Sequence, residues 1–396
     1  MPAKPAKKKI SRKNTGRLSV LYCLGLLLAV SSALPAYIQS NFLGEFVSVQ
    51  TVSLFFVIAN FLSVMAILSF PSLIKTITNY FATKAVLAVY LASLFGLSLA
   101  TGAGPALVSI TLFTITSSLI WINMDVLIES FSNNKATGKI RTIYFTFINI
   151  GWILSPLLSS YLIEKGQYTL TFLVAAFMVV PFYLVLISQG KKLKDRVEYQ
   201  KEDLPVTLKK MWNNKNLRGI FFVALLLSLF YSSAVIYIPI HLHRNLGMDW
   251  HSLGIIFSIM LIPFILIEIP AGIIADKYLG EKELLFAGFA ILITSLFLFY
   301  LIKTPNIWIW AGILFLSRTG AALIEAMRET YFFKIIDVEE VGYINIFRAT
   351  TPLGYVVGAG LAVLITNFFP LNYLFLSVTI VMLSGFWFTA SIKDTK

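Results

Sequence analysis

Several ionisable side chains lie inside long apolar stretches of this sequence of 396 residues. At the centre of a membrane helix, one such side chain costs about 2.5–3.5 kcal/mol on insertion scales. Charges at such positions therefore indicate a function by default. Burial favours the protonated form of a carboxyl group, and a nearby arginine favours the ionised form, so proton occupancy can change with conformation. The residues concerned are Asp125, Glu129, Glu268, Arg318, Glu325, Arg328, Glu329 and Arg348.

Helical spacing places several of these charges on common faces. Asp125 and Glu129 are four residues apart, which puts them on one face of a helix. Arg318 and Glu325 are seven residues apart and share a face of another helix, whereas Arg328 is predicted to point elsewhere.

A structural role is the alternative for charges near helix ends. There, snorkelling and ion pairing suffice, which applies to Glu129, Arg328 and Glu329. Lys282 is the expected partner of Glu329. Glu268 is deeper, and two interpretations stay open for it: a proton site, or an ion-pair partner of Arg348.

The composition identifies the environment of these charges. Hydrophobic residues make up 58% of the chain and charged residues 13%, against about 45–50% apolar and 25% charged in soluble domains. This excludes an ordinary soluble enzyme, a nucleic-acid-binding domain, a coiled coil and a disordered protein. The single cysteine, the three histidines and the lack of a GxxxxGK[ST] loop or other enzyme motif predict no metal site, no cofactor and no enzymatic activity.

Twelve apolar runs are each long enough to cross a membrane as a helix, which needs about 20 residues. Continuous runs of this length argue against a membrane β-barrel. We therefore predict an all-α polytopic membrane protein with twelve transmembrane helices in two six-helix bundles. The runs lie near 18–38, 47–69, 80–101, 106–128, 142–163, 168–188, 219–240, 251–275, 282–302, 307–330, 343–366 and 371–391.

The basic residues predict the orientation. With the N-terminus inside, 26 of the 32 Lys and Arg residues fall on the cytoplasmic side, together with both termini. We expect contact of this surface with anionic lipid. The Lys-rich tails and the absence of an N-x-[ST] sequence favour the plasma (inner) membrane of a prokaryote.

The chain divides at its middle. We predict a basic cytoplasmic tail (1–17), a first six-helix bundle (18–188), a cytoplasmic linker (189–218), a second six-helix bundle (219–391) and a short cytoplasmic tail (392–396). The loops 73–84 and 271–282 have equal length and lie 198 positions apart, half the length of the chain. Such matching positions indicate an old internal duplication.

Two local patterns resemble the major facilitator superfamily. The loop 271–282 is similar to a family signature with glycine, aspartate and basic residues at this spacing, whereas Ile74, Thr78 and Ala82 replace those residues in the first half. The second pattern, in span five, resembles the antiporter motif of drug/proton antiporters, although span four has Ser118 and no arginine where those proteins carry one. The matching residues are Gly272, Asp276, Lys277, Gly280 and Lys282 in the loop, and Gly151, Ser155 and Pro156 in span five.

Each loop residue has an expected physical role. Gly272 would allow close helix approach, Asp276 would face a helix N-terminus and Gly280 would allow a tight turn. Lys277 and Lys282 would pair with acidic helix ends. The small residues of span five would allow close helix packing.

The resemblance implies which residues form a binding site. In this superfamily, spans one, four, seven and ten line a central cavity. That makes Asp125, Arg318 and Glu325 candidates for substrate or proton binding, together with Glu268. The candidates for lining the cavity are Trp121, Tyr37, Gln39, Tyr231 and Tyr237.

The resemblance also implies a function. We expect a secondary transporter whose partners are a small solute and protons. It would work as a monomer by alternating access, and efflux of an amphipathic compound is the favoured direction. A proton-coupled symporter that imports a small metabolite and a non-transporting membrane protein are the alternatives.

Overall fold

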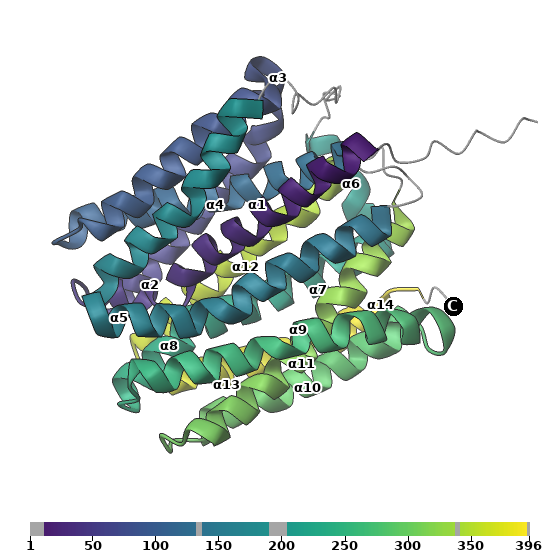
Figure 1. Cartoon of the computed structure of the whole chain (residues 1–396). Helices are drawn as coiled ribbons and strands as arrows, with labels where there is room; N and C mark the ends of the chain where they lie inside the picture. Colours follow the sequence, from purple (N-terminus) through teal and green to yellow (C-terminus); the bar gives the residue numbers. More distant parts are fainter. Residues whose placement is uncertain (1–11, 132–136, 190–203, 337–340, 394–396) are drawn as a thin grey trace, which may run out of the picture.

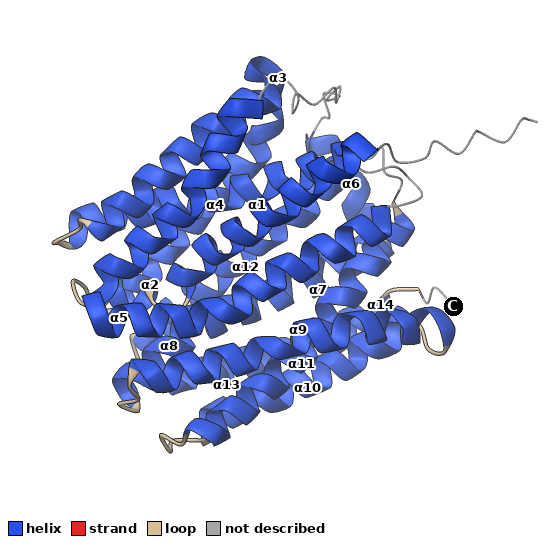
Figure 2. Ribbon diagram, viewed as in Figure 1, coloured by secondary structure: helices blue, strands red, loops and turns tan. Residues whose placement is uncertain are grey.

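Helices are the only regular secondary structure in the part of the chain that the structure describes (Figure 2). This computed structural model describes residues 12–131, 137–189, 204–336 and 341–393, without the side chains of 12–17, 71–79, 125–131, 137–142, 166, 186, 189, 204, 269, 276, 341 and 342. The helices are α1 (Arg12–Ala36), α2 (Gln39–Leu43), α3 (Val49–Ser98), α4 (Ala103–Phe131), α5 (Thr137–Gln189), α6 (Leu204–Asn213), α7 (Lys215–Ser232), the π-helix η1 (Ser233–Tyr237), α8 (Ile238–Ile240), the π-helix η2 (His241–Asn245), α9 (Trp250–Lys277), α10 (Glu281–Leu301), α11 (Ile307–Ile335), α12 (Val341–Thr366), α13 (Asn372–Met382) and α14 (Ser384–Ser391).

The prediction of twelve membrane spans is confirmed. Among the described residues, twelve helical segments are long and apolar enough to cross a membrane. Two of the helices, α3 and α5, contain two spans each. The seventh span runs without interruption through α7, η1, α8 and η2, from Lys215 to Asn245, and is longer than the predicted 219–240.

Polar caps fix the beginning of several spans. The side chains of Ser48, Asn214, Asp249 and Asn306 precede α3, α7, α9 and α11 and accept hydrogen bonds from the first free backbone N–H groups of those helices. These groups have no partner within the helix, so the caps satisfy donors that the apolar side chains cannot.

The helices form two halves that meet along two seams. In the first half, α1 packs on α5 and α3 packs on α4. In the second half, α9 and α10 pack on α11, and α12 packs on α7. The seams between the halves are formed by α5 with α9 and by α3 with α12. In Figure 1 the purple-to-teal helices of the first half lie on one side and the green helices α9, α10 and α11 lie on the other.

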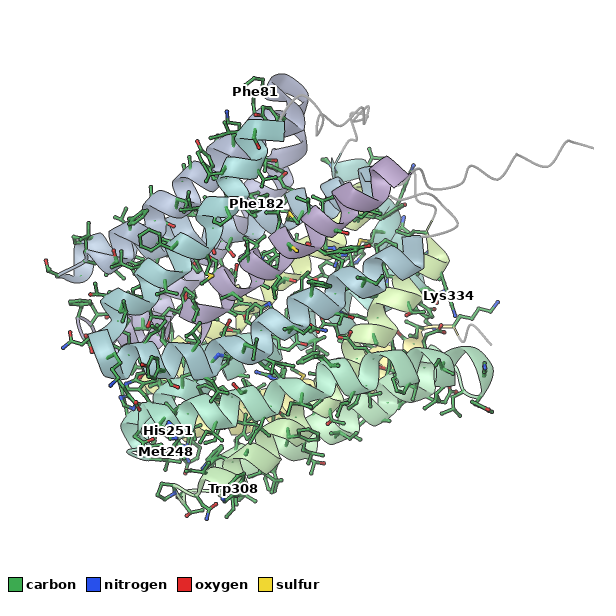
Figure 3. All side chains as sticks on the ribbon, viewed as in Figure 1. Phe81, Phe182, Met248, His251, Trp308 and Lys334 are labelled. Carbon is green, nitrogen blue, oxygen red and sulfur yellow. The ribbon has the colours of Figure 1, made fainter. Side chains whose placement is uncertain are left out.

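One end of the molecule, which we call the Arg244 end, carries α2 and η2. Arg244 of η2 donates hydrogen bonds to the carbonyl oxygens of Gly44 (2.8 Å) and Asn41 (2.9 Å) in the first half. The Tyr237 hydroxyl donates to Oγ of Ser53 at 2.8 Å, again between the halves. In Figure 3, Met248, His251 and Trp308 mark this end and Lys334 marks the opposite end, where α1 begins and α14 ends.

The α5–α9 seam is closed near the Arg244 end by small residues. A methyl group added to Gly254 of α9 would lie 2.8 Å from Cβ of Ser160 and 3.2 Å from the carbonyl oxygen of Pro156. Further along, Oγ of Ser258 donates to the carbonyl oxygen of Ile153 at 2.9 Å. Only small side chains permit helix backbones to approach this closely.

The span-five motif performs the packing role predicted for it. Gly151 faces α1, where an added methyl group would lie 2.8 Å from Cβ of Ala29. Ser155 is fully buried and donates to the carbonyl oxygen of Gly151 at 2.6 Å. Gly151 therefore packs α5 against α1, and the backbone of Pro156 packs it against α9 on the other face.

The predictions for the loop 271–282 are wrong at three residues. A methyl group at Gly272 would meet no atom of the described residues within 4 Å, so no described part of another helix approaches it closely. Gly280 has φ −134° and ψ 175°, an extended conformation that any residue adopts. The ammonium group of Lys282 donates to the carbonyl oxygens of Ala390 and Ile392, both at 3.1 Å, and thus binds free carbonyls at the end of α14 rather than an acidic side chain.

The roles predicted for the other two loop residues stay untested. Lys277 is exposed, and the side chain of Asp276 lies outside the described residues.

We predict that Arg244→Ala loosens the Arg244 end. The substitution removes two hydrogen bonds between the halves, and the population should shift toward conformations that are more open at this end. Spin labels at Leu99 and Phe368, two highly exposed positions in different halves, would report the change by double electron–electron resonance in a Cys23→Ser background. The expected result is a new population at longer distances.

Lys303→Ala provides the matched control, because Lys303 is an exposed basic residue between α10 and α11, at the same end. It should leave the distance distribution unchanged. Identical distributions for Arg244→Ala and Lys303→Ala would contradict a closing role for Arg244.

Candidate functional site

A cavity of about 450 Å³ lies between the two halves. Its walls come from α5, α9, α11 and α12, with Tyr37 from the end of α1 and Tyr231 from α7. On α5 the lining residues are 145–153 and on α9 they are 261–268, which places the cavity on the far side of the Ser258–Ile153 contact from the Arg244 end. The two helices are thus in contact near the Arg244 end and leave space between them toward the opposite end.

Three of the four charged candidates line this cavity together. Glu268 comes from α9, and Arg318 and Glu325 come from α11. The fourth, Asp125, belongs to α4, and its side chain lies outside the described residues. The seven-residue spacing on one face of α11 therefore gives the predicted juxtaposition of Arg318 and Glu325.

Arg318 is a buried cation in an aromatic setting. The residue is 1% exposed, and its guanidinium carbon lies 5.0 Å from the ring centroid of Phe230 and 5.6 Å from that of Tyr231. It also interacts with the Tyr37 hydroxyl. Its Nε and Nη1 atoms are buried without a hydrogen-bond partner among the described residues. Contacts of a cation with aromatic faces offset part of the loss of water.

Glu325 is held by two neighbours. The Tyr231 hydroxyl donates a hydrogen bond to its carboxylate, and Nη2 of Arg328 lies 3.7 Å from Oε1. The prediction that Arg328 points elsewhere is wrong, because residues three apart on a helix are neighbours. Arg328 is 6% exposed and Nη1 donates to the carbonyl oxygen of Ala224 at 3.4 Å, so it is an internal residue between α11 and α7.

Glu329 and Arg348 form an ion pair between α11 and α12. Nη1 of Arg348 lies 2.8 Å from Oε1 of Glu329, and both side chains are about one-quarter exposed. This corrects the predicted pairing of Glu329 with Lys282, whose ammonium group is bound at the end of α14. It also gives Arg348 a carboxylate other than that of Glu268.

Glu268 differs from the other carboxylates of the cavity. It is half-buried and lines the cavity, and it has no hydrogen bond or ion pair among the described residues. Its helix contains Pro263 and Pro270 on either side of it. Because no salt bridge holds Glu268, the carboxyl group can gain or lose a proton without breaking a pair.

The aromatic and polar candidates separate into two groups. Tyr37 and Tyr231 line the cavity, and Trp121 lines an adjoining cavity of about 410 Å³ that shares Glu325 with the first. Tyr237 instead bonds to Ser53 at the Arg244 end, and Gln39 is buried in α2. The cavity-lining role predicted for Tyr237 and Gln39 is therefore wrong, since both lie beyond the closed part of the α5–α9 seam.

Several lining residues were missed by sequence reasoning. Asn149 and Trp152 of α5, Phe264 of α9 and Tyr355 of α12 lie on the cavity wall. The resemblance implies a cavity lined by spans one, four, seven and ten, whereas these residues belong to spans five, eight and eleven. The i, i+3 spacing of Asn149 and Trp152 is the available signal, because it places one amide and one indole on the same helix face.

The arrangement suits reversible binding of a small molecule. Aromatic side chains form a mostly apolar wall, and a few charged groups converge on it, which is the usual composition of a small-molecule site. Among the described residues there is no group of three His, Cys, Asp or Glu side chains that could hold a metal ion.

The Glu329–Arg348 pair gives a testable coupling. We expect Glu329→Gln and Arg348→Gln each to lower the melting temperature of the purified protein, because each leaves a half-buried charge without this partner. The double variant should lose less than the sum of the two losses, since contacting residues typically couple by about 0.5–3 kcal/mol. Thermal unfolding of the four proteins measures this, and strictly additive losses would contradict the pair.

Comparison with known proteins agrees with this architecture. The family model of the Major Facilitator Superfamily matches residues 18–259 and 220–395, which together extend over nearly the whole chain. No curated protein gives a match. With twelve spans in two halves around a shared cavity, the chain belongs to the Major Facilitator Superfamily, a family of secondary transporters that move small solutes across membranes.

Proposed function

We propose that this protein is a proton-coupled transporter of an amphipathic solute, in which Glu268 takes up and releases the coupling proton. The observation that carries the proposal is the contrast among the three cavity carboxylates. Glu325 and Glu329 are bound by Tyr231 and Arg348, whereas Glu268 has no such partner among the described residues.

Alternating access supplies the transport cycle. The halves are joined at the Arg244 end by the contacts of Arg244, Tyr237 and Ser258, and the cavity lies toward the opposite end. With the predicted orientation in the plasma membrane of a prokaryote, both termini are cytoplasmic and the cavity faces the cytoplasm. Rocking of the two bundles about the cavity would then expose Glu268 and the solute to the other side.

The composition of the cavity wall supports an amphipathic solute. Trp152, Tyr231, Phe264 and Tyr355 offer large apolar faces with polar edges, and the charged groups lie between them. Such a wall favours a compact molecule with an apolar body and one polar or charged group. The size of about 450 Å³ lies in the range of ordinary small-molecule pockets.

Efflux is favoured by the resemblance of span five to an antiporter motif. Helix packing by Gly151 and Pro156 is equally required for import and export. A symporter is therefore the second candidate function, and its specific support is the presence of Arg318 and Glu268 in one cavity without an ion-pair partner among the described residues.

The experiment first identifies a solute and then tests Glu268. Thermal-shift screening of the purified protein against small amphipathic compounds finds ligands, because a ligand that binds the folded state raises the melting temperature. A hit is then followed in proteoliposomes under an imposed pH gradient of either sign. We predict that wild type accumulates the hit against its gradient for one sign only, which gives the direction.

We further predict that Glu268→Gln abolishes gradient-driven accumulation and retains solute exchange across the membrane, because a neutral amide resembles a permanently protonated carboxyl group. Glu283→Gln is the control, since Glu283 lies outside the cavity and accepts a hydrogen bond from the Gly280 backbone. Accumulation by Glu268→Gln at the wild-type level would remove Glu268 from the coupling mechanism.

A further inference from the structure

One cation of the cavity lacks a compensating charge. Arg318 is 1% exposed, and its Nε and Nη1 atoms have no hydrogen-bond partner among the described residues. The residue lies eleven positions into the 29-residue helix α11, far from either end of the span. A buried guanidinium without a carboxylate is costly, because desolvation is not offset by an ion pair.

The carboxylates near Arg318 either are bound by other groups or can lose their charge by taking up a proton. None of them is therefore a fixed partner of the guanidinium. Glu325 is bound by Tyr231 and lies 3.7 Å from Arg328. No ion pair within 4 Å joins Arg318 to any described carboxylate. The aromatic rings of Phe230 and Tyr231 support the guanidinium on its faces, and the Tyr37 hydroxyl interacts with it. Nε and Nη1 still have no acceptor among the described residues.

The two unpaired groups of the cavity, Arg318 and Glu268, are not equivalent. A carboxyl group can become neutral by binding a proton, whereas a guanidinium stays charged at every physiological pH. Glu268 can therefore become neutral by itself, and Arg318 cannot. A molecule that enters the cavity can supply the missing acceptor.

We propose that the transported solute is an organic monoanion whose carboxylate binds the N–H edge of Arg318 and whose apolar body lies against Trp152, Phe264 and Tyr355. This inference rests on the proposed transport function and names its substrate class. Charge-assisted hydrogen bonds from a guanidinium to a planar oxyanion give orientation as well as affinity. The aromatic wall then receives the rest of the molecule.

The charge balance links the anion to the proton. Among the described side chains, the cavity and its adjoining pocket are lined by three arginines (Arg318, Arg328, Arg348) and three glutamates (Glu268, Glu325, Glu329). Protonation of Glu268 leaves these six described groups with one net positive charge, which an anion would neutralise. Proton and anion therefore strengthen each other's binding, and by linkage the effect is reciprocal. Such joint binding is the property of a symporter.

The test compares three probes that share one apolar body and differ in charge: naphthoate, naphthamide and naphthylmethylammonium. Equilibrium dialysis against the purified full-length protein in detergent measures their affinities. We expect naphthoate to bind at least about tenfold more tightly than the amide, as a hydrogen bond to a charged group predicts, and the ammonium probe to bind most weakly. Naphthoate affinity should also fall as the pH rises.

Variants of Arg318 separate charge from shape. Arg318→Gln should remove the preference for naphthoate over naphthamide, and Arg318→Lys should retain part of it because the charge remains. Arg218→Gln is the matched control: Arg218 lies near the start of α7, outside the cavity, and donates to the carbonyl oxygen of Trp212. If Arg318→Gln does not fold, the ranking of probes by wild type and by Arg318→Lys decides the question.

Each outcome supports or overturns the inference. Equal binding of naphthoate and naphthamide, a preference for the ammonium probe, or no binding of any of the three overturns it. A preference for naphthoate that needs Arg318 but ignores both pH and Glu268→Gln supports the anion site and removes proton coupling. A pH effect on binding that needs Glu268, without a preference for the anion, keeps the proposed function and removes the substrate class.

Discussion

A charge that cannot be neutralised, placed inside an apolar bundle, constrains everything around it. The guanidinium of Arg318 is excluded from water by α7 and α11, so its surroundings must supply what water would have supplied. The structure provides two aromatic faces and an interaction with Tyr37, and nothing among the described residues serves the remaining N–H groups. The cavity adjoins this unsatisfied guanidinium, and Glu325 and Glu329 are bound by other groups, so neither carboxylate neutralises it.

The packing of the two halves determines from which end of the molecule a solute can reach Arg318. Small residues bring α5 and α9 together near the Arg244 end, so no solute can reach the cavity past Gly254 and Ser160. Beyond the Ser258–Ile153 contact the helices carry larger side chains that face space instead of one another. Because the same two helices form the closed seam and the cavity wall, closing one end and opening the other are a single movement and not two independent ones.

The sequence predicts the spans well because the signal for a membrane helix is continuous along the chain. Each apolar run is long enough to exclude other structures, and polar caps such as Asn214 and Asn306 mark where runs begin. Shared faces on α11 are also predictable, since the spacing of Arg318 and Glu325 fixes their relative direction.

Contacts between helices are less accessible to such reasoning. The rotation of each helix about its axis depends on packing partners, which an aromatic-rich composition leaves open. The sequence therefore favours Tyr237 and Gln39 as cavity residues, although they lie at the closed end, and it does not single out Trp152 and Tyr355. Arg328 shows a related difficulty. Its position on the helix is readily derived, but the direction of its long side chain is not, and this side chain lies near Glu325, three residues earlier.

The seventh span contains two π-helical segments, η1 and η2, on either side of Pro239. A π-turn holds more residues than an α-turn, so such segments store a shift in helical register, and they are often found at functional sites. Conversion of one π-turn to an α-turn would rotate the helix beyond it by about 100°, the angle per residue of an α-helix. Tyr237 and Arg244 would then turn away from Ser53 and Gly44. Span seven thus has a local means of unlocking the Arg244 end by twisting, without any bending of the surrounding helices.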